Sequence, residues 1–166
     1  MATAPKKALI RKPRHQDDDT KPAGSPKRLR ATPRLTAREL LAAIWPTDKE
    51  KSTDISVRTM KKVKAPKILE GYACYRFTTF NRANRHVHKV TLFFAEGTVG
   101  YNSHVIVDSD TPRFLFYYEY ALAKRGNAFI YRSNGEPPLR TNPRNKAGID
   151  KHIYVCLRYM IKFHKG

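Results

Sequence analysis

Residues 69–80 have the sequence LEGYACYRFTTF, and their pattern determines which type of fold we expect. Successive side chains of a β-strand point to opposite faces. Ala73, Tyr75 and Phe77 would therefore share one face, and Cys74 and Phe80 would share the other. Apolar and aromatic residues on both faces, repeating with a period of two, indicate a strand inside a packed β domain.

Six other segments have a similar composition and predict further strands. They are residues 55–64, 87–95, 99–107, 114–122, 128–132 and 153–163. The last shows the clearest alternation, from Ile153 to Phe163. Turns rich in Gly, Pro, Asn and Asp separate the segments at short intervals, and residues 134–150 form the longest irregular connection. Many short strands of this kind are typical of an all-β, antiparallel sandwich or barrel.

One short helix is expected before the strands, over residues 36–45. Thr36 is a suitable N-cap, and Glu39 three residues later completes a capping box. Pro46 would end the helix.

The charged residues divide the chain into two parts. Residues 1–34 contain ten of the 33 Lys and Arg residues, three of the 14 acidic residues, five of the eleven prolines and no aromatic residue. Such a segment buries too little apolar surface to offset its ordering entropy, so we expect a disordered basic arm. Residues 35–166 would form the β-sandwich domain, including the short helix.

The formal net charge of +19 predicts a polyanionic partner. Nucleic acid is the expected one, bound through its phosphates without sequence preference. No apolar run is long enough to span a bilayer, so no membrane partner is expected. The predicted nucleic-acid-binding residues are Lys6, Lys7, Arg11, Lys12, Arg14, Lys21, Lys27, Arg28, Arg30, Arg34, Lys61, Lys62 and Lys64.

Two basic clusters in the arm resemble a bipartite nuclear localisation signal. They are separated by twelve residues and consist of Arg11, Lys12 and Arg14, and of Lys27, Arg28 and Arg30. The resemblance implies a host importin as a partner and the nucleus as a location. It favours single-stranded DNA over RNA as the nucleic acid. A phosphate-binding arm alone would have the same composition, and the two roles are compatible.

Candidate chemistry is limited to a histidine pair. His86 and His88 would project from the same side of a strand and could bind one divalent metal ion. Together with residues 77–80, and with the pairs Tyr120–Lys124 and Tyr159–Lys162, they resemble motifs of HUH-type rolling-circle endonucleases.

The chain departs from the endonuclease pattern in two respects. Only five residues separate Phe80 from His86, where that family has tens, and both tyrosines fall in segments predicted to be strands rather than helices. Solvent-facing histidines on a nucleic-acid-binding strand are the alternative. We therefore expect no enzyme, no catalytic residue, no metal site and no cofactor. The two cysteines, Cys74 and Cys156, lie in apolar stretches and are expected in the core.

The whole layout resembles the jelly-roll capsid proteins of small icosahedral viruses, such as circular single-stranded DNA viruses and satellite viruses. The matching parts are the basic residues 6–34, the consecutive strands of residues 69–122 and the closing strand of residues 153–163. The resemblance implies a protein of the virion that self-assembles into a shell around single-stranded nucleic acid. A nucleic-acid-binding accessory protein that does not assemble is the alternative.

Overall fold

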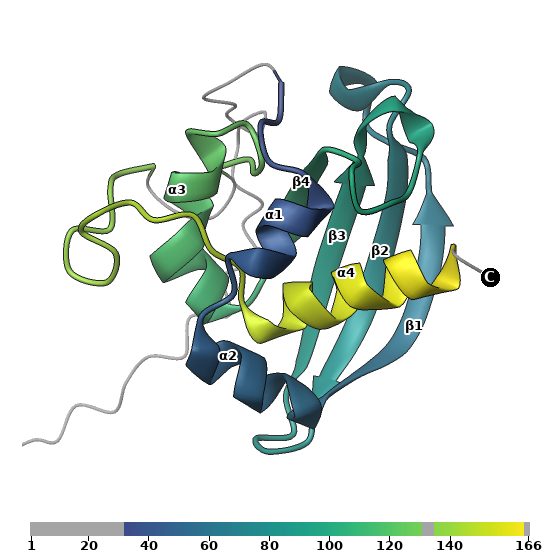
Figure 1. Ribbon diagram of the computed structural model, residues 1–166. Coiled ribbons are helices and arrows are strands. Elements are labelled where there is room, and N and C mark those ends of the chain that lie inside the picture. The colour runs from purple at the N-terminus through teal and green to yellow at the C-terminus, as the bar shows by residue number, and fades with distance from the viewer. Residues whose placement is uncertain (1–31, 131–134, 165–166) are drawn as a thin grey trace, which may run out of the picture.

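The computed structural model describes residues 32–130 and 135–164. Its centre is an antiparallel sheet in which the strands lie side by side in chain order (Figure 1). The four strands are β1 (Ile55–Val63), β2 (Ala73–Asn81), β3 (Val87–Phe94) and β4 (Val105–Ser109). The antiparallel sheet expected from the sequence is thus confirmed.

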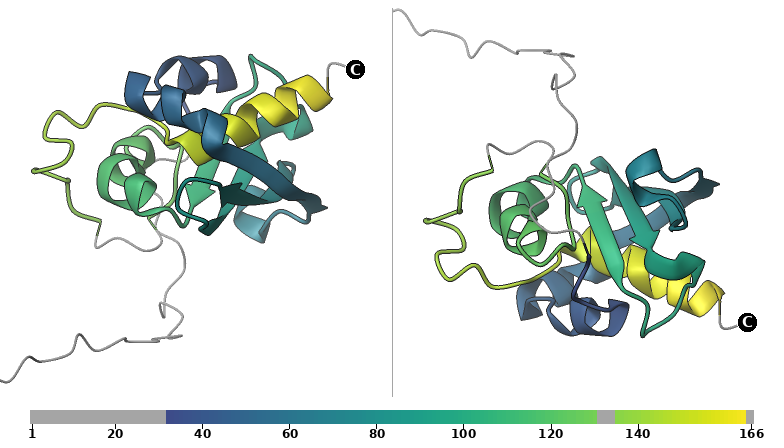
Figure 2. Two further views of the ribbon diagram at one scale, coloured as in Figure 1. Left: turned by 90° about the horizontal axis from the view of Figure 1, so that it is seen from below. Right: turned by 90° about the horizontal axis from the view of Figure 1, so that it is seen from above.

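Helices lie mainly on one side of this sheet. The α-helices are α1 (Ala37–Ala42), α2 (Pro46–Glu50), α3 (Glu119–Ala123) and α4 (Lys151–Phe163). Short 3-10 helices are η1 (Lys51–Asp54), η2 (Lys67–Leu69) and η3 (Ala95–Gly97), and the π-helical turn η4 (Phe114–Tyr118) leads into α3. Figures 1 and 2 show α4 crossing the sheet diagonally on the same side as α1 and α2, with α3 beyond the β4 edge.

The predicted first helix is confirmed together with its cap. The Thr36 hydroxyl accepts from Glu39 N, and the Glu39 carboxylate accepts from Thr36 N at 2.8 Å, which completes the capping box. The helix ends at Ala42, earlier than expected, and Pro46 begins α2 instead of ending α1. Proline suits the first turn of a helix because the first backbone N–H groups have no helical acceptor.

The strand predictions for residues 55–64, 69–80 and 87–95 are confirmed in their main parts. β2 begins only at Ala73, because η2 and a turn with Gly71 at φ +86° precede it. The strand predicted over residues 99–107 is displaced: β4 covers Val105–Ser109, and residues 99–104 form the loop before it.

The strand prediction for residues 114–122 is wrong, because these residues are helical. Thr111 acts as a cap, with its Oγ1 accepting from Phe114 N at 3.2 Å, and Pro112 follows in the first turn. A threonine followed by proline is a recognised helix start. The alternation of large aromatic residues concealed it.

The strand prediction for residues 153–163 is also wrong, and the segment is helix α4. Its sequence satisfies both periods. Ile153, Leu157 and Ile161 are buried, as a strand would require, but Tyr159 and Phe163 from the same predicted strand face are 41% and 59% exposed. The buried positions 153, 156, 157, 160 and 161 follow the helical spacing instead.

A second sheet, which a sandwich requires, does not occur in residues 32–130 and 135–164. The sequence also predicts a strand over residues 128–132. In the structure Ala128 forms a single parallel bridge with Val107, and residues 131 and 132 lie outside the described part.

The core consists of two hydrophobic clusters, one on each side of the sheet. The larger fills the space between the sheet and α4, and the smaller, which includes Leu69, Phe93 and Phe129, covers one end of the opposite face.

Both cysteines are free and buried, as expected. Within the described residues, every helix is too short or too polar to span a bilayer.

Candidate nucleic-acid interface

The sheet has one face that the described helices leave uncovered over much of its area. Cross-strand partners share a face, and the β2 residues Phe77 and Thr79 face α4, so their neighbours Arg76, Thr78 and Phe80 face the other way. We call this surface the open sheet face. Its residues are Ser56, Arg58, Thr59, Lys61, Arg76, Thr78, Phe80, Val87 and Lys89.

Cations from three adjacent strands gather on this face. Lys61 of β1 is the direct partner of Arg76 on β2, and Lys89 of β3 is the partner of Thr78. All three cationic side chains are exposed. Like charges directly opposite each other destabilise an antiparallel pair, so the Lys61–Arg76 pair contributes nothing favourable to the isolated fold.

A β-bulge places a fourth cation there. The register shifts between Val57 and Thr59, so β1 contains one residue more than β2 at this point. The guanidinium of Arg58, inside the bulge, lies 3.9 Å from the centre of the Phe80 ring. This cation–π contact orients Arg58 on the open sheet face and leaves a flat cationic group beside an aromatic ring.

Protection of the sheet edge explains only part of this charge. Lysines on an edge strand discourage pairing with other chains, which could account for Lys61 and Lys62 on β1. It does not account for Arg76 and Lys89, which lie on the inner strands β2 and β3. The acidic residue in the same cross-strand row, Asp108, is on β4 at the far side of the sheet.

Four of the predicted nucleic-acid-binding residues lie in the described part, and all four are exposed: Arg34, Lys61, Lys62 and Lys64. Lys62 pairs with Tyr75 on the α4 side of β1, and Lys64 follows the strand. Arg34 N donates to Arg125 O at 3.0 Å, so the end of the predicted arm contacts the folded domain.

The remaining predicted residues lie outside the described part, together with both halves of the predicted nuclear signal. These are Lys6, Lys7, Arg11, Lys12, Arg14, Lys21, Lys27, Arg28 and Arg30.

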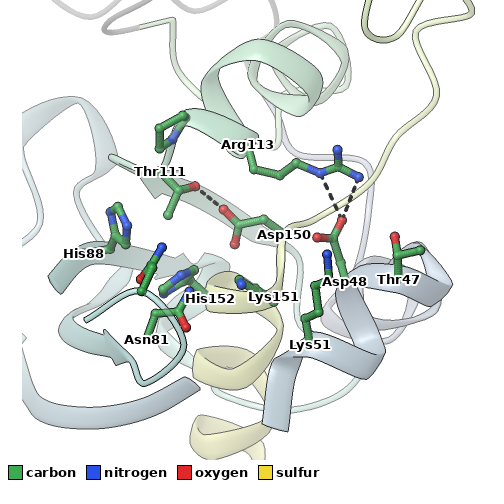
Figure 3. Close-up of a pocket in the computed structure, with 12 residues that line it drawn as sticks. Thr47, Asp48, Lys51, Asn81, His88, Thr111, Arg113, Asp150, Lys151 and His152 are labelled. Carbon is green, nitrogen blue, oxygen red and sulfur yellow. Dashed lines mark hydrogen bonds and ion pairs between the residues drawn. The ribbon is translucent and has the colours of Figure 1, made fainter. Parts of the chain in front are cut away.

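His88 and His152 lie at a separate cleft, at the N-terminus of α4. This cleft has a volume of about 300 Å³, and its lining includes His88, His152, Lys51, Lys151 and Arg113 (Figure 3). His88 Nδ1 is 3.1 Å from an oxygen of Asp110, and the rings of His88 and His152 are 4.8 Å apart.

His152 is held neutral beneath this cleft. Thr79 Oγ1 donates to the His88 carbonyl, so His152 Nδ1 donates to Thr79 Oγ1 at 2.8 Å. Burial, followed by the neighbouring charges of His88 and Lys151, lowers the pKa of His152 to about 3. His152 is therefore a structural residue at neutral pH.

Arg113 is already neutralised within the same cleft, because it forms an ion pair with Asp48 at 3.1 Å. Asp150 is buried and caps α4, so it too is engaged in the fold.

No family model, curated protein or solved structure matches this chain.

The second departure from the endonuclease motifs, which placed both tyrosines in strands, is wrong. Tyr120 lies in α3 and Tyr159 in α4, so both tyrosines are helical, contrary to the prediction from the sequence. Neither lines the cleft that contains His88. The rings of His86 and His88 are 6.3 Å apart, but the described residues contain no group of three potential metal ligands. Histidines and tyrosines are thus not brought into one site.

Three surface neighbours of Lys61 are absent from the residues that the sequence predicts, namely Arg58, Arg76 and Lys89. For Arg76 a signal was present, since it interrupts the aromatic alternation of residues 69–80 on the face that would otherwise be apolar. For Arg58 there was none, because its direction depends on the bulge.

Proposed function

We propose that this protein binds nucleic acid through its phosphates, without sequence preference, and that the open sheet face is the principal contact surface of the folded domain. The observation that supports the proposal is the group of cations on three adjacent strands, in which Lys61 lies directly opposite Arg76. A polyanion converts this repulsion into attraction, because a phosphate between the two strands contacts both cations.

Exposed cations spread over three strands suit a chain of phosphates better than a small ligand. Lys61, Arg76 and Lys89 are exposed, and among the described residues none of them forms a salt bridge. Such side chains release counterions when they neutralise phosphates. The basic arm, the importin partner and the preference for single-stranded DNA remain predictions from residues 1–34.

Substitution of three cations of the open sheet face tests the proposal. We compare the full chain with K61Q/R76Q/K89Q in binding a labelled single-stranded oligonucleotide, by fluorescence anisotropy at several salt concentrations. Neutralising about three phosphate contacts should reduce the salt slope by about two and weaken binding by about tenfold or more at low salt.

A matched control removes the same charge elsewhere. K49Q/K124Q/K146Q replaces exposed lysines on α2, after α3 and in the loop of residues 135–150. The control should bind within about twofold of the unmodified protein. Equal losses in both triple variants would show that net charge alone determines binding, and would contradict a specific role for the open sheet face.

Assembly into a shell is the second candidate, and exposed apolar side chains away from the open sheet face favour it. Phe116 and Leu139 are 63% and 73% exposed. A jelly-roll shell protein would need a second sheet, in addition to the sheet of β1 to β4 that the described residues form. Closed particles in negative-stain micrographs are the observation that it requires, and small oligomers at all concentrations would exclude it.

A further inference from the structure

Helix α4 has partly exposed apolar residues next to its buried side, and two of them also contact the core: Val155 packs against the larger hydrophobic cluster, and the Tyr159 ring lies edge-on to the buried Phe77. Val155, Tyr159 and Phe163 follow each other at intervals of four residues, so they form one stripe along the helix. The Tyr159 and Phe163 rings are 41% and 59% exposed, and they are parallel within 9°, with centroids 6.3 Å apart. Clustered exposed aromatic residues of this kind mark interaction surfaces.

A groove of about 530 Å³ includes two residues of this stripe, Val155 and Tyr159, in its lining. Ser52 and Thr53 of η1 line it from one direction, Tyr101 of the loop between η3 and β4 contributes from another, and α4 forms its floor. Figure 1 shows α4 with η1 and this loop on either side of it. We call this the α4 groove; its residues from α4 are Tyr154, Val155, Arg158, Tyr159, Ile161 and Lys162.

The charges of the α4 groove are of one sign. Arg158 and Lys162 contribute cations, and the residues that line the groove include no Asp or Glu. Arg158 lies over the Tyr154 ring at 5.6 Å, and Arg38 of α1 lies over the Tyr101 ring at 5.8 Å. The groove therefore combines the partly exposed aromatic side chains of Tyr101 and Tyr159 with guanidinium and ammonium groups.

We propose that the α4 groove binds unpaired bases of a single-stranded nucleic acid, which stack on Tyr159 and Tyr101 while Arg158 and Lys162 contact the flanking phosphates. This inference rests on the proposed function and adds strand selectivity to it. Every base has a π-face, so stacking of this kind needs no particular sequence. A duplex keeps its bases stacked on each other and cannot use the groove in this way.

Charge argues against a second copy of this chain as the occupant. A twofold dimer through the same stripe would place Arg158 and Lys162 of one copy against the same cationic surface of the other. Like charges brought together in this way oppose association, whereas a nucleic acid is complementary to them.

The edge strand β1 carries a cation on its α4 side as well as on the open sheet face. Lys62 is the cross-strand partner of Tyr75, and the Tyr75 hydroxyl is 3.4 Å from Nε2 of His164, next to Phe163. Lys62 therefore lies on the α4 side of the edge strand β1, while its neighbour Lys61 lies on the open sheet face. One strand could pass around this edge and contact both surfaces.

The test compares single-stranded with duplex binding in the full chain. Y101L/Y159L keeps apolar volume and removes both aromatic faces, and F116L is the control, because Phe116 is an exposed aromatic residue outside the groove. Loss of stacking should weaken binding of oligo(dT) by about tenfold. Duplex affinity and the salt slope should stay within about twofold of the unmodified protein, and F116L should resemble it with both ligands.

Photocrosslinking locates the contact without any substitution. A single-stranded oligonucleotide containing 5-iodouracil should crosslink to Tyr159 in the tryptic peptide of residues 159–162, which is cut after Arg158 and Lys162. Unchanged oligo(dT) binding by Y101L/Y159L, with no crosslink in this peptide, would overturn the groove proposal while leaving binding at the open sheet face intact. Absence of any nucleic-acid binding by the unmodified chain would overturn both. A change of oligomeric state in Y101L/Y159L without loss of oligo(dT) affinity would identify a second copy as the occupant and overturn the groove proposal.

Discussion

His152 shows how burial gives a single side chain a defined influence on stability. The ring is 3% exposed, donates to Thr79 and contacts His88. Its pKa falls from 6.5 to about 3, chiefly because burial disfavours the charged form. The unfolded chain therefore takes up a proton near pH 6.5, whereas the folded chain does so only near pH 3.

This difference predicts a loss of stability on acidification. Above pH 6.5 the imidazole is neutral in both states and contributes no pH dependence. As the pH falls from 6.5 towards 3, protonation of the unfolded state lowers the free energy of unfolding by up to about 1.4 kcal/mol per pH unit. Urea unfolding of the unmodified protein and of His152→Asn, at pH values from 7 to 4, isolates this contribution.

Asparagine keeps an amide N–H near the position of Nδ1 but does not titrate in this range. The variant should therefore lose less stability on acidification than the unmodified protein. Both proteins contain the same carboxylates, so the carboxylate contribution to the pH dependence cancels in the comparison. Parallel pH profiles of the two proteins would mean that His152 takes up its proton over the same pH range in the folded and in the unfolded chain.

At the scale of elements, the N-terminus of α4 connects the helix to the sheet. The Asp150 carboxylate accepts from Ile153 N at 2.9 Å and from the Thr111 hydroxyl, which itself caps the turn before α3. Burial raises the pKa of Asp150, and hydrogen bonds from Thr111 and from the helix backbone oppose this shift.

Removal of this cap should destabilise the protein measurably. We expect Asp150→Ala to lower the free energy of unfolding by about 2 kcal/mol, because it removes the helix cap and a buried acceptor. Asp150→Asn keeps one cap oxygen and should lose less than half as much. Equal losses for the two substitutions, in thermal or urea unfolding, would indicate that the carboxylate charge and not the cap oxygen determines the effect.

The elements also show how far the sequence predicts this fold. The strands β1, β2 and β3 and the capping box of α1 follow from local patterns, because alternation and cap residues act over a few positions. The sequence of α4 predicts a strand because Val155, Tyr159 and Phe163 are apolar although they are not fully buried, which gives a helix the alternation of a strand. Apolar residues outside the buried stripe can thus conceal the period that folding requires.

For the molecule as a whole, the sequence predicts a basic domain but not where its charge lies. Composition predicts Lys61, whereas the placement of Arg76 and Lys89 beside it follows only from the register of three strands. The open sheet face and helix α4, which lines the α4 groove, lie on opposite sides of the sheet. A long single strand is the kind of ligand that can reach both.

Lysine footprinting tests the central claim most directly, because it reports where the nucleic acid lies. The full chain is acetylated briefly with and without saturating single-stranded oligonucleotide, and the modified lysines are quantified by mass spectrometry. We predict severalfold protection of Lys61 and Lys89, with Lys49 and Lys124 unchanged. Protection of Lys49 and Lys124 instead, or unaltered acetylation of Lys61 and Lys89 at saturation, would contradict binding at the open sheet face.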